Sequence, residues 1–113
     1  MYSFKQRSRI KNQEQFKYVF SVGKKFYTKG FIIYLVSTEN SVSSYGFIAG
    51  KKVGNAVKRN RSKRLLREIV RLNQSKLIKG YNMVLIAKHL IFNYSFEDLN
   101  VDFLTGLAKL DAL

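Results

Sequence analysis

The stretch that says most about this protein covers residues 55–73 and reads NAVKRNRSKRLLREIVRLN. Its apolar residues recur at the three- and four-residue spacing of an amphipathic helix and share one arc of about 160°. These residues are Leu65, Leu66, Ile69, Val70 and Leu72. Gly54 and Asn55 come just before them as a turn and an N-cap. We therefore predict a helix that buries this arc and ends near Asn73.

The opposite side of the same helix is cationic. Its ladder consists of Asn60, Arg64, Arg67 and Arg71, with Arg61 and Lys63 on the flanks. A solvated helix face normally interleaves acids that form ion pairs four residues apart, and here Glu68 is the only acid. Arginine suits bidentate phosphate contacts and stacking on bases. Lys51 and Lys52 precede the helix and would add an anion site near its N-terminal amides. The pattern therefore indicates a side of the helix that binds nucleic acid, in preference to one that only faces solvent.

Both ends of the chain also carry helix signals. Asn12 followed by Gln15 resembles a capping box, and predicts a short helix that Gly23 ends. Near the other end, Ser95 is the expected cap of a last helix. The inward stripe of that helix is predicted to be Phe96, Leu99, Phe103, Leu107 and Leu110.

Three runs are typical of strands, at residues 31–36, 45–49 and 82–87. Lys24 and Lys25 are expected to form a basic turn, and residues 37–44 a loop across which the first two strands pair antiparallel. The resulting order is helix, strand, strand, helix, strand, helix. This order predicts an α+β fold, a single small two-layer sandwich whose sheet is covered by helices.

Length and composition limit the alternatives. The chain has 113 residues, enough for one domain (1–113) in which residues 1–11 form a basic arm. The hydrophobic fraction of 46% argues against a disordered chain, and the absence of cysteine excludes disulfides and thiol-ligated metals. The longest apolar run, residues 31–36, is far too short to span a membrane, and the basic N-terminus lacks a signal-type apolar segment. We expect a cytoplasmic protein.

The net charge is +14 and it is concentrated in two segments. Residues 1–30 carry eight basic residues and one acid, for +7, and residues 51–71 carry nine basic residues and one acid, for +8. Residues 72–113 carry four of each and are neutral. Such segments on a neutral remainder predict a polyanionic partner.

The sequence offers no set of groups for protein-based phosphodiester hydrolysis, which needs paired carboxylates or an acid–base set. The only histidine, His89, follows a strand among apolar residues and is more typical of a structural role. Glu97, Asp98 and Asp102 belong to the last helix, away from the basic motif. We predict no catalytic residue, no metal site and no cofactor bound by this chain itself.

Residues 50–68, GKKVGNAVKRNRSKRLLRE, resemble the signature of the bacterial ribonuclease P protein subunit. The core of this resemblance is the triplet Arg59-Asn60-Arg61 followed by Lys63-Arg64 and Arg67. The flanks match as well, and the resemblance covers nearly the whole chain. The matching flank residues are Arg9-Ile10-Lys11, Phe16, Val19, Phe20, Tyr34 and Gly80-Tyr81.

The resemblance implies a left-handed β-α-β crossover, against the usual hand. It also implies that the protein binds a catalytic RNA, and that the complex is an endoribonuclease that removes the 5′ leader of precursor tRNA. The chemistry would belong to magnesium ions held by the RNA, with neither a membrane nor a small-molecule substrate involved. The positions that would contact the catalytic RNA are Lys51, Lys52, Arg59, Asn60, Arg61, Lys63, Arg64, Arg67 and Arg71.

A cleft between the first helix and the sheet would receive the single-stranded leader. Its positions are Phe16, Phe20, Ile32, Tyr34, Ile48 and Lys52. Aromatic faces hold single-stranded RNA by stacking, while cations follow the backbone. The family usually has a small hydroxyl residue where this chain has Ile48. The residues alone leave open that these aromatic side chains are core, and that the protein is a ribosomal or other structural RNA-binding protein or a nucleoid-type DNA binder.

Overall fold

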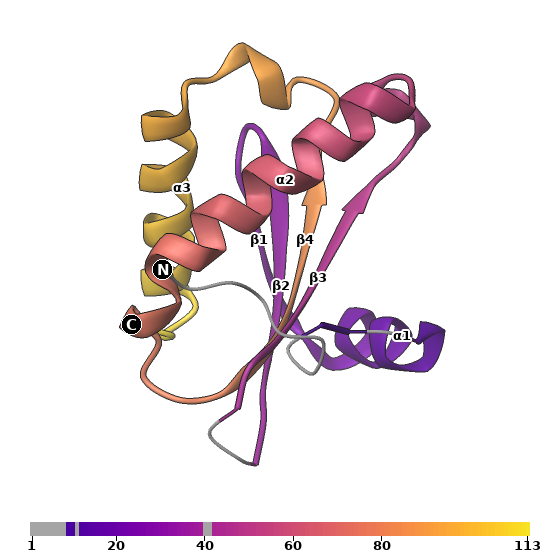
Figure 1. Ribbon diagram of the computed structural model, residues 1–113. Coiled ribbons are helices and arrows are strands. Elements are labelled where there is room, and N and C mark those ends of the chain that lie inside the picture. Colours follow the sequence, from indigo (N-terminus) through magenta and orange to yellow (C-terminus); the bar gives the residue numbers. More distant parts are fainter. Residues whose placement is uncertain (1–8, 11, 40–41) are drawn as a thin grey trace.

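The protein folds into a four-stranded sheet with helices on both faces (Figure 1). The structure is a computed structural model that describes residues 9–10, 12–39 and 42–113. The main elements in chain order are α1 (Gln13–Val22), β1 (Lys24–Tyr27), β2 (Phe31–Ser37), β3 (Ser44–Ala49), α2 (Ala56–Asn73), β4 (Tyr81–Ala87) and α3 (Phe96–Lys109). Short 3-10 turns are η2 (Lys51–Val53), η3 (Gln74–Lys76) and η4 (Ile91–Asn93). The predicted α+β class is confirmed, and the structure adds one strand to the predicted order.

The three predicted helix starts are confirmed by their cap hydrogen bonds. Asn12 Oδ1 accepts from the backbone N–H of residue 15 at 2.9 Å, and Asn55 Oδ1 accepts from that of residue 58 at 3.0 Å. Ser95 Oγ accepts from the backbone N–H of residue 98 at 3.0 Å. Gly54 has φ 140° and ψ −155°, a conformation that only glycine adopts readily, so it sets the turn into α2.

The added strand is β1, where the sequence predicted a basic turn. Lys24, Lys25, Phe26 and Tyr27 pair antiparallel with residues 32–35 of β2. Consecutive lysines resemble a turn in sequence, yet exposed lysine is also a common device for protecting the outer strand of a sheet from further pairing. Because β1 is the edge strand, its outer backbone and its lysines face solvent.

The sheet order β1-β2-β4-β3 corrects the predicted hairpin. β2 and β3 do run in opposite directions, but β4 lies between them, antiparallel to β2 and parallel to β3. β4 is the most thoroughly buried strand, with five of its seven residues buried. A strand that is apolar on both sides gains most from the centre of a sheet, where both of its faces are covered.

The connection from β3 through α2 to β4 is left-handed, as the resemblance implied. In Figure 1 both parallel strands point upward, α2 lies in front of the sheet, and β4 lies to the left of β3. A right-handed crossover would place β4 on the right.

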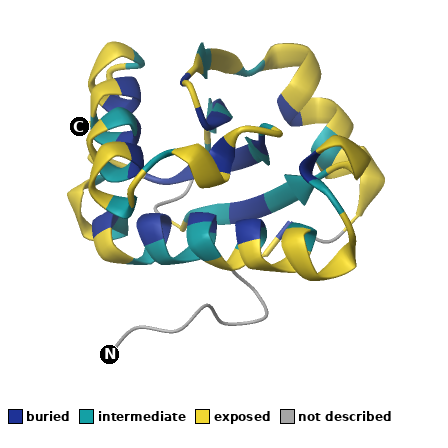
Figure 2. Ribbon diagram, turned by 90° about the horizontal axis from the view of Figure 1, so that it is seen from above, coloured by how far each residue is buried: buried dark blue, intermediate teal, exposed yellow. Residues whose placement is uncertain are grey.

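The main core lies on the α2 and α3 side of the sheet. It joins the inward residues of α2 and α3 to alternate residues of the strands, among them Phe31, Ile33 and Leu85. A smaller cluster on the other face holds Val19 of α1 against Val84 of β4. The predicted two-layer sandwich thus gains a short third layer, because α1 packs on the face of the sheet opposite α2 and α3. In Figure 2 the buried positions of the helices lie on the sides that are turned toward the sheet.

The predicted apolar arc of α2 needs one correction. Leu66, Ile69 and Val70 are buried, whereas Leu72 is 48% exposed. Two polar residues are buried instead. Ser62 Oγ donates to the backbone carbonyl of residue 59 at 2.8 Å, and Asn73 Nδ2 donates to that of Ile69 at 2.8 Å. Their hydrogen bonds satisfy the polar groups, so burial costs little.

The predicted basic arm falls mostly outside the described residues, which omit residues 1–8 and Lys11. Of the remainder, Ile10 is buried against the α1 side of the sheet, and Arg9 forms a single parallel bridge with Tyr45 of β3. Within the described residues, no helix is long and apolar enough to cross a membrane.

Candidate nucleic-acid interface

The cationic side of α2 faces away from the core as predicted. Asn60, Arg61 and Arg64 are exposed, and so are Lys51 and Lys52 in η2. The other predicted positions of the helix are partly buried, namely Arg59, Lys63, Arg67 and Arg71. We call these nine side chains the basic face.

Arg67 is fixed in place by the neighbouring strand. Its guanidinium carbon lies 5.4 Å from the ring centroid of Phe47 in β3, a cation–π arrangement. Partial burial, followed by the charges of Arg9 and Arg64, lowers the pKa of Arg67. The charges of Arg9 and Arg64 therefore repel that of Arg67, and an anion placed beside Arg67 would offset this repulsion.

The sequence missed Arg9 and Phe47 as parts of this site. Arg9 matches the family's flank, but it is far from residues 50–68 along the chain, and no periodicity links the two. Phe47 is close to the motif in sequence but belongs to a separate element. Arg9 comes close only because the residues before α1 bridge to β3, and Phe47 faces α2 only through the strand's register.

Arg71, predicted as one of the unpaired cations along the exposed side of α2, instead forms an ion pair. Its Nε donates to Glu68 Oε2 at 2.8 Å, and a second contact from Nη2 to Oε1 makes the ion pair bidentate. The pairing lowers the pKa of Glu68 and raises that of Arg71. Within the described residues this is the only ion pair, so the basic face loses one charge at its C-terminal end.

The predicted leader residues gather on the other side of the sheet. The ring centroids of Phe16 and Phe20 in α1 lie 6.4 Å apart. The Phe20 ring packs edge-to-face against Tyr34 of β2, with 4.9 Å between the two ring centroids. Phe16 passes close over β3 because residue 46 is glycine: an added Cβ would lie 2.6 Å from the ring. Phe20 is 38% exposed, while Phe16 and Tyr34 are partly buried.

Beyond this aromatic group, α1 leaves part of the sheet uncovered. The strand register aligns Tyr27, Ile32, Ile86 and Ile48 in one row across all four strands. We call this row the open face. Its isoleucines are only partly buried although two of them lie on central strands, and Tyr27 is 55% exposed. In Figure 1, α1 lies beside the opposite end of the strands.

The two surfaces lie on opposite faces of the sheet and approach each other at β3. η2 follows β3 after one residue, so Lys51 and Lys52 stand where the open face ends and the basic face begins. The predicted role of Lys52 in both sites stays a prediction.

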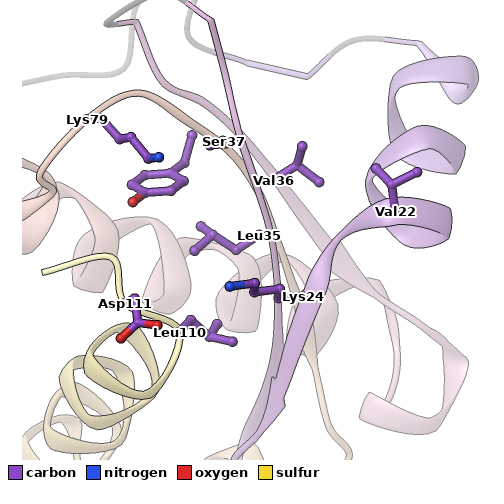
Figure 3. Close-up of a pocket in the computed structure, with 9 residues that line it drawn as sticks. Val22, Lys24, Leu35, Val36, Ser37, Lys79, Leu110 and Asp111 are labelled. Carbon is purple, nitrogen blue, oxygen red and sulfur yellow. The ribbon is translucent and has the colours of Figure 1, made fainter.

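A pocket of about 290 Å³ lies elsewhere, between the end of α1, the start of β1 and the end of α3 (Figure 3). Lys24, Lys79 and Asp111 are at its rim, over a floor that includes Leu35 and Leu110. None of its lining residues belongs to either predicted site.

The acids predicted to be remote from the motif lie on α3, where Glu97 and Asp98 are exposed in its first turn. His89 is exposed in the turn after β4. Among residues 9–10, 12–39 and 42–113, no three His, Cys, Asp or Glu side chains come together as a metal site.

Comparison with known proteins gives a consistent result. The sequence model of a family described as Ribonuclease P matches residues 4–111. The ribonuclease P protein component of Natranaerobius thermophilus is 42% identical over 79 residues, 70% of this chain and 69% of that protein. That of Syntrophomonas wolfei is 37% identical over 103 residues, 91% and 87% of the two chains.

Solved structures show the same likeness. The RNase P protein of Thermotoga maritima superposes with a TM-score of 0.76 at 26% identity, over 86% of this chain and 92% of that one. A Staphylococcus aureus RNase P protein mutant gives a TM-score of 0.84 at 22% identity, over 96% and 92%, which is evidence of a shared fold.

Proposed function

Since this chain belongs to the bacterial ribonuclease P protein family, we propose that it binds the catalytic RNA through its basic face and the 5′ leader of precursor tRNA on the opposite face of its sheet. The family has a role in tRNA 5′ processing as part of a ribonuclease. The proposal assigns the catalytic groups and the magnesium ions to the RNA, and places the complex in the cytoplasm.

The observation that carries the proposal is the separation of two chemically different surfaces. The basic face offers guanidinium groups, which bind phosphates and stack on bases. The aromatic side chains Phe20 and Tyr34 offer stacking surface without charge, which suits unpaired bases. One chain can therefore hold a folded RNA and a single strand at the same time, with Lys52 between them.

The separation predicts different responses to mutation and salt. Losing a phosphate contact should lower the salt slope of binding by about one, whereas losing a stacked base should leave the slope nearly unchanged. Arg64→Ala should therefore weaken assembly with the catalytic RNA and reduce its salt dependence. Tyr34→Ala should weaken binding of precursor tRNA by about 1–3 kcal/mol without changing the slope.

The test is equilibrium binding of the reconstituted complex to mature tRNA and to precursors with leaders of increasing length, at two salt concentrations. Tyr34→Phe is the matched control, because it keeps the ring and removes only the hydroxyl. Equal loss of affinity for mature and precursor tRNA in Tyr34→Ala would show that the tyrosine is core.

The activity of the isolated protein is a second test. Without RNA it should cleave nothing, and with the catalytic RNA it should raise cleavage at low magnesium by screening phosphate charge. Site-specific cleavage by the protein alone would contradict the proposal. Copurification with ribosomal subunits in place of one large non-ribosomal RNA would instead favour a structural RNA-binding protein.

A further inference from the structure

The open face ends on the edge strand β1, where Tyr27 stands opposite Ile32. In the next row of the sheet, Lys25 of β1 stands opposite Tyr34, one of the aromatic residues that the family resemblance singled out. Side chains at paired positions project from the same side of a sheet, so Lys25 and Tyr27 lie on the same side as Phe20 and Tyr34.

Lys25 and Tyr27 form a unit. The Lys25 Nζ lies 5.6 Å from the ring centroid of Tyr27. Both side chains are exposed, Tyr27 to 55%. A side-chain hydrogen bond with Tyr27 is the main cause that raises the pKa of Lys25. An exposed aromatic ring beside a cation can bind one base and one phosphate of a single strand.

The surrounding charge favours an anionic occupant. Lys29 is exposed in the turn after β1, and Lys88 Nζ donates to the backbone carbonyl of Thr28 at 2.9 Å. Within the part of the chain that the structure describes, none of these lysines forms an ion pair with a carboxylate. Lys25 thus lies beside the Tyr27 ring, and two further lysines belong to or contact the turn that follows Tyr27.

We propose that Tyr27 and Lys25 form an outer subsite for one further nucleotide of the single-stranded leader, beyond those held at Phe20 and Tyr34. This inference rests on the leader-binding role proposed above. The row from Ile48 to Tyr27 crosses three strand spacings, about 14 Å, and its Ile48 end belongs to β3, the strand that leads into η2. Tyr27 therefore takes a nucleotide at the end of the row opposite to Ile48.

The test uses the complex reconstituted with catalytic RNA, and precursor tRNAs whose leaders are lengthened one nucleotide at a time. In Tyr27→Ala, affinity for precursors with the longest leaders should fall about fivefold, which is the lower end of the range for losing one stacked base. Affinity for precursors with short leaders and for mature tRNA should stay unchanged. Tyr27→Phe should keep wild-type affinity. Lys25→Gln should reduce the salt slope by about 0.7 for the long leaders only.

Tyr18→Ala is the matched control. Tyr18 is also 55% exposed, but it lines a different pocket with Val36 and Asn82, toward the other end of the strands. Its removal should change neither affinity nor length dependence. Thermal unfolding of each variant by circular dichroism checks that the fold is intact.

The outcomes separate the two proposals. If Tyr27→Ala behaves like Tyr18→Ala at every length while Tyr34→Ala still loses leader-dependent affinity, the outer subsite is wrong and the leader role stands. If Tyr27→Ala and Tyr34→Ala both bind all leaders like the wild type, the leader role itself is wrong. If Tyr27→Ala weakens assembly with the catalytic RNA regardless of leader, Tyr27 contacts that RNA and the subsite is refuted.

Discussion

Gly46→Ala tests whether α1 is held over the sheet as closely as the structure indicates. The new Cβ would lie 2.6 and 2.8 Å from two ring carbons of Phe16 and 3.5 Å from Cβ of Ile10. The two ring contacts are closer than side chains tolerate, so the Phe16 ring must turn aside or the start of α1 must shift. The substitution places a steric conflict at one defined point of the α1 side of the sheet.

The expected magnitude follows from two opposing effects. Overpacking of this kind costs about 1–3 kcal/mol, while replacing glycine by alanine gains about 0.4–1 kcal/mol from the unfolded chain. The net loss should be about 1–2 kcal/mol in the free energy of unfolding, or about 4–10 °C in Tm for a chain of this size. Leader-dependent binding should weaken as Phe16 moves, and assembly through α2 on the opposite face should not.

Denaturant and thermal unfolding followed by circular dichroism measure the loss. Gly50→Ala is the matched control, because nothing lies within 4 Å of its added Cβ and its φ of −86° suits alanine. Combining Gly46→Ala with Phe16→Leu should recover part of the stability, with a coupling energy of at least about 0.5 kcal/mol. Wild-type stability in Gly46→Ala, or strict additivity in the double variant, would refute the packing argument.

Three further predictions concern single contacts. Glu68→Gln should release Arg71 from its ion pair and tighten binding to the catalytic RNA at low salt, and the slope of log affinity against log salt should steepen by up to about one. Unchanged binding in a salt titration would show that Arg71 faces no phosphate. Thr28→Val should lower the free energy of unfolding, measured in urea, by about 1–3 kcal/mol. The buried Thr28 hydroxyl accepts from the Phe31 N–H at 3.0 Å and donates to the Phe31 carbonyl at 2.8 Å. A smaller loss of stability would mean that another group satisfies the Phe31 N–H. Arg64→Ala should leave Tm within about 1 °C of the wild type, since the side chain is exposed opposite the core, and a large drop would show that the helix register is wrong.

Features that depend on neighbours along the chain followed from the sequence. The caps at Asn12, Asn55 and Ser95 act over three residues, so their hydrogen bonds were predictable. The amphipathic period placed Leu66 inward and Arg64 outward for the same reason. Strands β2 and β4 were evident because a continuous run of β-branched and aromatic residues has few other stable conformations.

Features that depend on distant partners required the tertiary structure. The lysines of β1 form a strand only because β2 offers an edge, and β4 separates β2 from β3 because the most apolar strand gains most from the centre of the sheet. Leu72 lies on the predicted apolar arc, yet no element covers it within the described residues. The open face, and with it the position of Tyr27 beside the aromatic residues, follows from strand register. The hydrophobic period of one segment indicates which of its side chains share a face. Which residue of another strand lies opposite each of them depends on packing between residues far apart in the chain.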